Sequence, residues 1–413
     1  MSHPLKRQPP YIRLANGLGG VLERAGLSRP SLCPEHLMRR AQARTGLDNW
    51  GDASFRVGLD RLTASLEREA NLTQIGRIVA YLNLLDHLSV RLRLIDYRAS
   101  HPEVAAQRIE RPLFIVGLPR TGTSILHELL AQDPALRAPA TWEVARPVPP
   151  PAPAARDTDA RIARVDRLLG LLEKLSPGFQ PIHAVGARLP QECVYMLSSA
   201  FASEQFGYMY RVPDYRAWLL EQDLTAAYAW HAAFVQHLQS GGGEARWVLK
   251  TPAHLPNLSY LFGQYPDACI VWTHRRPLQA IASFSSLACT LRRGFSRGVD
   301  PREVGEEQLR HYARVARRGM EERRALGEER FFDVGFSAIC DNPAGVIREI
   351  YERFSMTLTD AAEQRMRAYL SERPRNLYRE HRYSAAAFGL DSACEYDHFA
   401  DYLERFGRCV DGA

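Results

Sequence analysis

Four short apolar segments of the chain have the pattern of strands that are buried on both faces. They are residues 112–116 (PLFIV), 246–250 (RWVLK), 268–274 (ACIVWTH) and 330–336 (RFFDVGF). Each is rich in β-branched or aromatic residues, as are the strands of a parallel sheet covered by helices. Each is also followed by a helical pattern. This alternation predicts an α/β fold with a parallel sheet and flanking helices.

Prolines mark the start of two of the helices that follow these strands. Pro277 and Pro343 each occupy the position expected for the first residue of a helix, where a missing N–H costs nothing. The helix after Pro343 has an apolar stripe on one face, which predicts burial of that face against the sheet. The stripe consists of Val346, Ile347, Ile350, Tyr351 and Phe354.

Two further regions have helical patterns without strands, at residues 18–98 and at about 157–240. The second region follows a proline-rich loop and ends at a run of three glycines. We interpret residues 1–105 as an N-terminal helical region packing on the core, and residues 106–413 as the main domain with the second region inserted. Both helical regions are expected to cap the carboxyl edge of the sheet, where α/β proteins bind their ligands.

Composition narrows the class of protein. The chain has 413 residues, of which 24% are charged and 46% apolar, as in an ordinary soluble globular protein. No apolar run approaches the length of a membrane span, and the first residues lack the apolar core of a secretory signal. The net charge of +6 comes from arginines balanced by nearby glutamates, so a small anionic ligand is favoured over nucleic acid.

The seven cysteines indicate a reducing compartment. Their number is odd, and none is paired at the spacing of a metal site, so neither a disulfide framework nor a metal is expected. We therefore predict a cytoplasmic protein.

The residues after the first strand, GLPRTGTS, resemble a phosphate-binding loop that has lost its lysine. Gly117, Gly122 and Ser124 have the required spacing, but Thr123 occupies the position of the phosphate-binding lysine. The loop connects a strand to a helix, so its backbone amides are expected to face an anion at the helix N-terminus. Arg120 provides a cation from another direction. These features favour a ligand with one charged group at this point over a magnesium–triphosphate.

A second anion site is predicted after the third strand. Arg275 ends that strand, and Ser283 lies about two turns into the helix that begins at Pro277. A guanidinium and a hydroxyl at this spacing can bind one anion together, with charge-assisted hydrogen bonds from the arginine. Two anion sites at one sheet edge, without a Walker lysine, indicate a nucleotide that is phosphorylated at both ends.

These motifs together resemble the bacterial branch of the sulfotransferases that use 3′-phosphoadenosine-5′-phosphosulfate (PAPS). GLPRTGTS is similar to their 5′-phosphosulfate loop, and Arg275 with Ser283 is similar to their 3′-phosphate clamp. Further similar stretches follow in the family's order: APATWEVARPVPPP, LPQECVYML, WVLKTPAHL, FSAICDNPAGVIREIYERF and HRYSAAAFGLD. The resemblance implies a P-loop-like sulfotransferase fold, PAPS as donor, adenosine 3′,5′-bisphosphate (PAP) as product, no metal, and a hydroxylated small-molecule acceptor.

The resemblance also implies roles for single residues. The 5′ end of the donor is expected to lie against Arg120, Thr121, Gly122, Thr123 and Ser124. Lys250, at the end of the second strand, would stabilise charge on the leaving oxygen. Two residues are candidates for the base: His254, four residues after Lys250, and Glu143 in TWEV. The alternatives are that Glu143 only caps a helix and that His254 is a satisfied histidine at a helix start.

The chain departs from the family pattern in three places. Arg276 stands where an aspartate is usual, Phe336 where a tyrosine is usual, and Ala338 where an acidic residue is usual. Phe336 keeps a face for stacking against the nucleotide but loses the hydroxyl group. In the segment HRYS, Arg382 and Ser384 are expected to return to the nucleotide.

Two other functions compete with sulfuryl transfer. An ATP-dependent kinase would need a lysine before Ser124 and carboxylates for magnesium, and neither is evident. The other competing function is that of a non-catalytic nucleotide-binding relative. The presence of Lys250, His254 and Glu143 weighs against it. The aromatic residues of the insertion suit an apolar acceptor such as a lipid, polyketide or phenol, and packing of a helical core would explain them equally well. A homodimer is expected by analogy with relatives.

Overall fold

The computed structural model describes residues 29–180, 182, 184–243, 245–372 and 384–411, together with Pro10 and Asn16. Its centre is a parallel sheet of five strands in the order β2-β3-β1-β4-β5. The strands are β1 (Leu113–Gly117), β2 (Leu136–Arg137), β3 (Arg246–Lys250), β4 (Cys269–His274) and β5 (Phe331–Gly335). The α/β fold and the four strands expected from the sequence are confirmed. The edge strand β2 was not predicted from the sequence, because its two residues are too few to show an apolar pattern.

The register of the sheet brings several strand ends to one edge. Ile115 of β1 is paired with Lys250 of β3, and Gly117 of β1 is paired with Thr273 of β4. The last residues of β1, β3 and β4 therefore lie at neighbouring positions on the carboxyl edge. The segments that leave these three strands must begin close together.

Most of the described chain outside the sheet is helical. The α-helices are α2 (Pro34–Thr45), α3 (Phe55–Arg68), α4 (Gln74–Ser100), α5 (Thr123–Leu130), α6 (Thr141–Ala145), α7 (Ala160–Leu175), α8 (Cys193–Ser198), α9 (Gln205–Met209), α10 (Pro213–Glu221), α11 (Thr225–Ser240), α12 (Leu258–Gln264), α13 (Pro277–Phe295), α14 (Pro301–Leu326), α15 (Phe336–Asp341), α16 (Pro343–Arg353), α17 (Asp360–Glu372) and α18 (Ser392–Asp411). Short 3-10 segments are η1 (Pro102–Val104), η2 (Pro153–Ala155), η3 (Pro252–Asn257) and η4 (Ala385–Phe388).

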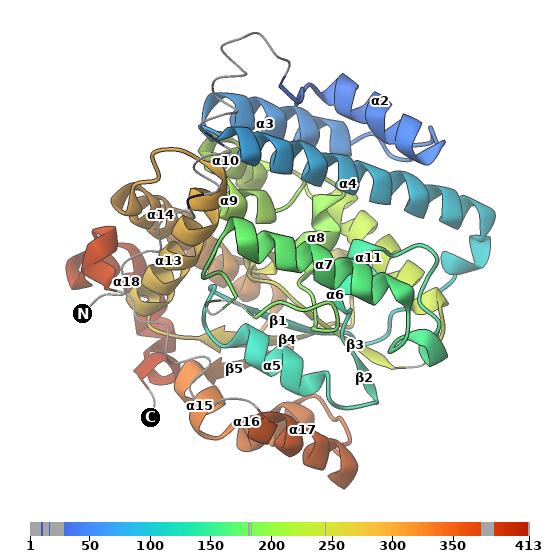
Figure 1. Ribbon diagram of the computed structural model, residues 1–413. Coiled ribbons are helices and arrows are strands. Elements are labelled where there is room, and N and C mark those ends of the chain that lie inside the picture. Colours follow the sequence, from blue (N-terminus) through green and yellow to red (C-terminus); the bar gives the residue numbers. More distant parts are fainter. Residues whose placement is uncertain are drawn as a thin grey trace.

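The two helix starts expected at prolines are confirmed, because α13 begins at Pro277 and α16 at Pro343. The apolar stripe of α16 is buried as predicted. It packs with β1, β4 and β5 residues in a core on one side of the sheet. Figure 1 shows α5, α16 and α17 on this side, with the larger helical layer on the opposite side.

The helices of the insertion and of the N-terminal region form successive layers on that opposite side (Figure 1). Residues of both regions belong to one continuous hydrophobic core with the sheet. At one contact Gly76 of α4 lies against the Phe295 carbonyl at the end of α13, where a Cβ atom would collide. The Thr73 N–H also donates to the Phe295 carbonyl, at 2.8 Å. Residues 29–100 are thus packed directly on the main domain.

None of the described helices combines the length and the apolar character that a membrane span requires. The long helix α4 is buried on all sides near its middle, where His87 to Leu92 are all buried, whereas Ile78 and Leu82 nearer its start are exposed.

A buried cluster of charges joins three helices beside the sheet edge. The Glu307 carboxylate of α14 accepts two hydrogen bonds from Arg292 of α13, at 2.6 and 2.7 Å, and one from Arg216 of α10 at 2.9 Å. Both guanidinium groups are almost completely buried. Burial alone would raise the pKa of Glu307, but the hydrogen bonds and charges of the two arginines lower it to about 2. The carboxylate therefore stays charged at neutral pH.

We predict that Glu307→Gln lowers the free energy of unfolding by about 3–5 kcal/mol at pH 7, because it leaves the buried Arg292 without its counter-charge and leaves Arg216 with Glu204 alone. Urea unfolding followed by circular dichroism measures this loss. Glu306→Gln, on the exposed side of the same helix, is the control and should change little.

Glu307→Gln also tests how the stability of the protein depends on pH. A carboxylate with a lowered pKa in the folded protein contributes stability above its unfolded pKa, and loses it as pH falls through the folded value. For Glu307 this window runs from the ordinary value of 4.5 down to about 2. The difference in stability between wild type and Glu307→Gln should therefore narrow as pH falls below about 4.5. A constant difference would show that Glu307 does not carry this charge.

Candidate functional site

The loop between β1 and α5 turns tightly at the carboxyl edge of the sheet. Gly117, Arg120 and Gly122 have positive φ angles of 144°, 68° and 94°. A Cβ atom on Gly117 would lie 2.5 Å from the Thr273 carbonyl oxygen of the neighbouring strand. The buried hydroxyl of Thr121 is 2.6 Å from that of Thr273. These contacts fix the loop to β4.

Helix α5 starts directly after this turn. Its first N–H groups have no partners within the helix, and they carry the positive end of the helix dipole. A Cβ atom on Gly122 would lie 3.1 Å from Ile339 and 3.2 Å from Phe336, so a larger residue would fill the space in front of the turn. The amides of the expected loop residues, Thr121 to Ser124, are thus at a helix N-terminus that can hold an anion.

The two predicted anion sites are brought together by the fold. Ser283 of α13 is almost fully buried, and its hydroxyl oxygen accepts a hydrogen bond from Arg120 Nε at 3.3 Å. Arg275 donates to the backbone carbonyl of Arg120 at 3.1 Å. The Arg275 guanidinium lies 4.2 Å from the centre of the Phe336 ring. Two cations, one hydroxyl and one aromatic face therefore converge at the end of the loop.

Lys250, the last residue of β3, forms a buried ion pair beside the loop. Its Nζ is 2.5 Å from Glu192 Oε1 and 3.1 Å from Ser124 Oγ. Glu192 also accepts a hydrogen bond from the Thr251 hydroxyl, at 3.3 Å. The ammonium group is only 3% exposed, so it has exchanged water for these protein oxygens. A fixed cation and a carboxylate thus stand at the N-terminus of α5.

A cavity of about 220 Å³ lies in front of the loop. Lys250 does not line it, but its partners Ser124 and Glu192 do. The polar end of the cavity includes Arg120, Gly122, Thr123, Ser124, Glu192, Arg275 and Phe336. The remainder is mostly apolar and is built by the inserted helices and α13, through residues such as Leu172, Phe179, Tyr195, Tyr208, Phe284 and Leu287. A site with an apolar wall and a few convergent polar groups is typical of small-molecule binding.

The inserted helices cap the carboxyl edge as expected, since α7, α8 and α9 contribute to the cavity wall. The expectation was wrong for the N-terminal region: none of the described residues 29–105 lines this cavity. Helices α3 and α4 instead pack on the outer helices α10 and α13. Their apolar faces support the cap from behind.

The sequence did not single out Glu192 as a functional residue. It lies in the stretch LPQECVYML, which was identified only by its similarity to the family. A glutamate directly before a short helix has no pattern of its own, and its partner Lys250 is distant in sequence. The only available signal was a carboxylate inside a stretch similar to the family.

Glu143, one of the two candidate bases, lies outside the cavity lining. Its Oε2 accepts the Ala140 backbone N–H at 2.9 Å, which caps the start of α6. Its Oε1 is 3.4 Å from the buried Arg137 guanidinium. Both oxygens thus have local structural partners.

His254, the other candidate, is fully buried in η3 and also lies outside the cavity lining. Its Nδ1 is 2.8 Å from the Tyr228 hydroxyl oxygen. Burial and the neighbouring His231 lower the pKa of His254 well below its usual value. The imidazole is therefore neutral and sits beneath the site in the core.

The remaining expected residues do not contribute to the described cavity lining. Arg382 is outside the described residues. Ser384 is exposed before η4 and does not line the cavity. Arg276 pairs with the buried Glu395 of α18, at 3.0 Å. The extra cation at this position therefore joins α18 to the start of α13.

Comparisons with known proteins agree with this geometry. Residues 112–360 match the family model described as "Sulfotransferase family". Sulfotransferase STF9 from Mycobacterium avium superposes with a TM-score of 0.84 and 29% identity, over 92% of this chain and 98% of that chain. Sulfotransferase STF1 from Mycobacterium tuberculosis H37Rv superposes with a TM-score of 0.80 and 31% identity, over 89% and 98%.

A curated relative is similar over most of its length. It is the omega-hydroxy-beta-dihydromenaquinone-9 sulfotransferase Stf3 of Mycobacterium bovis, 24% identical over 313 residues, which are 72% of this chain and 75% of that protein. The family match covers more than half of the chain, and both solved structures superpose on most of it. The chain therefore belongs to the sulfotransferase family.

Proposed function

We propose that this enzyme transfers a sulfuryl group from PAPS to a hydroxyl group of an apolar small molecule and releases PAP. The observation that carries the proposal is the cavity at the carboxyl edge of the sheet, which has Arg120, Arg275 and Glu192 at one end and an apolar wall at the other, with Lys250 paired to Glu192 behind the lining. Family membership supports the reaction type. The donor and the acceptor class are the proposed parts.

The residues at the polar end fit a donor with phosphate at both ends of the nucleoside. The loop turn leaves room in front of Gly122, and the amides of α5 can hold the phosphosulfate. We assign Arg275 and Ser283 to the 3′-phosphate and Phe336 to stacking with the adenine. Arg120 can serve either end, since it contacts Ser283 and belongs to the loop. The roles of Arg382 and Ser384 stay predictions.

We propose Glu192 as the base that takes the proton from the acceptor hydroxyl. Of the three carboxylate and histidine candidates, Glu192 lines the cavity, whereas Glu143 and His254 do not. Its carboxylate oxygens accept hydrogen bonds from Lys250 and Thr251, which hold the group at the cavity wall. A base must come within hydrogen-bond reach of the proton that it removes, and this position supplies that reach.

Lys250 is proposed to stabilise the charge that develops on the leaving phosphate oxygen. An ammonium group has three donors, and contacts with Ser124 and Glu192 use two of them. The remaining donor can serve the leaving oxygen without any change in the backbone. Sulfuryl transfer, like phosphoryl transfer, depends mainly on positioning and on such charge stabilisation.

The acceptor is proposed to be apolar around its reactive hydroxyl. Aromatic and aliphatic side chains dominate the cavity wall away from the donor site. The name of the relative Stf3 describes a hydroxylated menaquinone as its substrate, which supports a lipid-like acceptor for this chain. A kinase reaction is less well supported, because Thr123 replaces the lysine that binds the β- and γ-phosphates.

We predict that the protein binds PAP more tightly than AMP or magnesium–ATP in calorimetry, and that Arg275→Ala weakens PAP binding about 10- to 100-fold by removing charge-assisted bonds. Arg276→Ala is the matched control, since the neighbouring Arg276 pairs with Glu395 and should leave PAP affinity nearly unchanged. Preferential binding of magnesium–ATP would overturn the proposed donor.

Glu192→Gln is expected to lower kcat by about 10²–10⁴-fold, because the amide cannot accept a proton, while the affinity for PAP is retained. Transfer of labelled sulfate from PAPS to an acceptor measures the rate. Glu143→Gln, the capping glutamate of α6, is the control. Loss of activity in Glu143→Gln with full activity in Glu192→Gln would reverse the assignment.

The apolar wall gives a prediction about the acceptor. Leu172 lines the cavity and its neighbour Leu171 is half exposed outside it, so Leu172→Glu should raise KM for apolar alcohols and phenols, and Leu171→Glu should not. A buried charge at the wall disfavours apolar ligands. Transfer to sugars alone, with no apolar acceptor used, would contradict the proposed acceptor class.

A further inference from the structure

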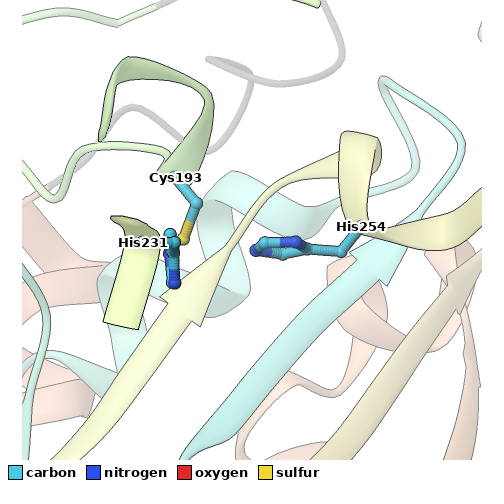
Figure 2. Close-up of side chains that lie close together, drawn as sticks. All are labelled: Cys193, His231 and His254. Atoms are coloured by element: carbon cyan, nitrogen blue, oxygen red, sulfur yellow. The ribbon is translucent and has the colours of Figure 1, made fainter. Parts of the chain in front are cut away.

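Beneath the proposed site, three side chains from different elements point toward one another in the core. They are Cys193 of α8, His231 of α11 and His254 of η3, and all are fully buried. One potential ligand atom from each lies within 4.8 Å of the other two. Figure 2 shows the His254 ring directed at the Cys193 sulfur and the His231 ring.

Each histidine has one nitrogen satisfied and one without a partner. His231 Nδ1 is 2.8 Å from the Tyr265 hydroxyl, and His254 Nδ1 is 2.8 Å from the Tyr228 hydroxyl. The Nε2 atoms of both rings are buried and have no hydrogen-bond partner among the described residues. Leaving such an atom unsatisfied costs about 1–3 kcal/mol, so two in one cluster call for an explanation.

The protonation of the cluster suits a metal. Burial lowers the pKa of His231 to about 3 and that of His254 well below its usual value, so both rings are neutral, as metal ligands must be. Burial raises the pKa of the Cys193 thiol to about 12, with a backbone hydrogen bond from Lys250 opposing the change. A bound cation would reverse this and favour the thiolate.

We propose that Cys193 Sγ, His231 Nε2 and His254 Nε2 bind a zinc ion. Thiolate with imidazole is a ligand set that zinc prefers, whereas calcium and magnesium require oxygen. Zinc-ligand bonds of about 2.0–2.3 Å place ligand atoms about 3.5 Å apart, so the cluster contracts by about 1 Å on binding. Binding releases the thiol proton to solvent and leaves both imidazoles neutral.

The hydroxyl groups of Tyr228 and Tyr265 form hydrogen bonds with the ring nitrogens that do not face the proposed ion. With Nε2 bound to the ion, the proton of each ring is on Nδ1, and each phenol oxygen accepts it. A partner of this kind fixes the tautomer and the orientation of a metal-bound histidine. The existing hydrogen bonds are therefore already those that the bound state requires.

The ion would join the two segments that carry the proposed catalytic pair. Cys193 directly follows Glu192, and His254 lies one short 3-10 turn after Lys250. Zinc would thus hold α8 against η3 from below, while the Lys250–Glu192 pair holds them from above. The inferred role is structural, and it holds whether or not the reaction proposed above is correct.

Metal analysis of the full chain tests the site without any activity assay. The protein is expressed in zinc-supplemented medium, purified under reducing conditions without chelators, and analysed by plasma mass spectrometry. We expect one zinc ion per chain, lost in Cys193→Ser and in His231→Asn. The matched controls Cys289→Ser and His237→Asn, at other buried positions, should keep the ion.

X-ray absorption at the zinc edge is measured on the wild-type protein, so it tests the site even if the variants do not fold. One sulfur and two imidazoles around the ion would support the site, and coordination without sulfur would overturn it. Zinc-free wild-type protein that takes up no zinc on refolding, or retention of zinc by folded Cys193→Ser, would also overturn it. Neither readout depends on PAPS or on an acceptor.

Discussion

Parallel pairing of β1 with both β3 and β4 is the constraint on which the site depends. Because the register aligns Ile115 with Lys250 and Gly117 with Thr273, the strands end together at one edge. The loop after β1, the lysine that ends β3 and the arginine after β4 then face a common space. A shift of the register would move these ends apart along the strands, and no rearrangement of side chains alone would restore the site.

Buried charges then fix what the sheet edge has brought together. Lys250 and Glu192 are removed from water and satisfied by each other, by Ser124 and by Thr251. Burying such a pair is costly, so its presence here is better explained by a need for a fixed cation and carboxylate than by stability. The Arg292–Glu307 pair holds α13, the helix that carries Ser283, against α14. Two separate buried ion pairs thus fix the two sides of the proposed donor site.

The layers of helix have different relations to this edge. The inserted helices provide the cavity wall and the carboxylate Glu192, while the N-terminal helices α3 and α4 pack behind them and do not reach the cavity. The apolar residues of α4 from Leu84 to Leu94 are buried in the core. The insertion supplies much of the cavity wall, and the N-terminal helices pack behind it.

The sequence by itself determined the α/β class, four of the five strands, the helix starts at Pro277 and Pro343, and the strand–loop–helix turn after β1. These are local features, because strand burial, helix starts and turn geometry depend on neighbouring residues. The tertiary structure decided which acidic group faces the cavity, since Glu192 meets Lys250 only when α8 packs over β3. It also decided that His254 lies in the core with Cys193 and His231, residues far apart in the chain. Contacts of this kind arise from the packing of distant elements, and no spacing along a single sequence encodes them.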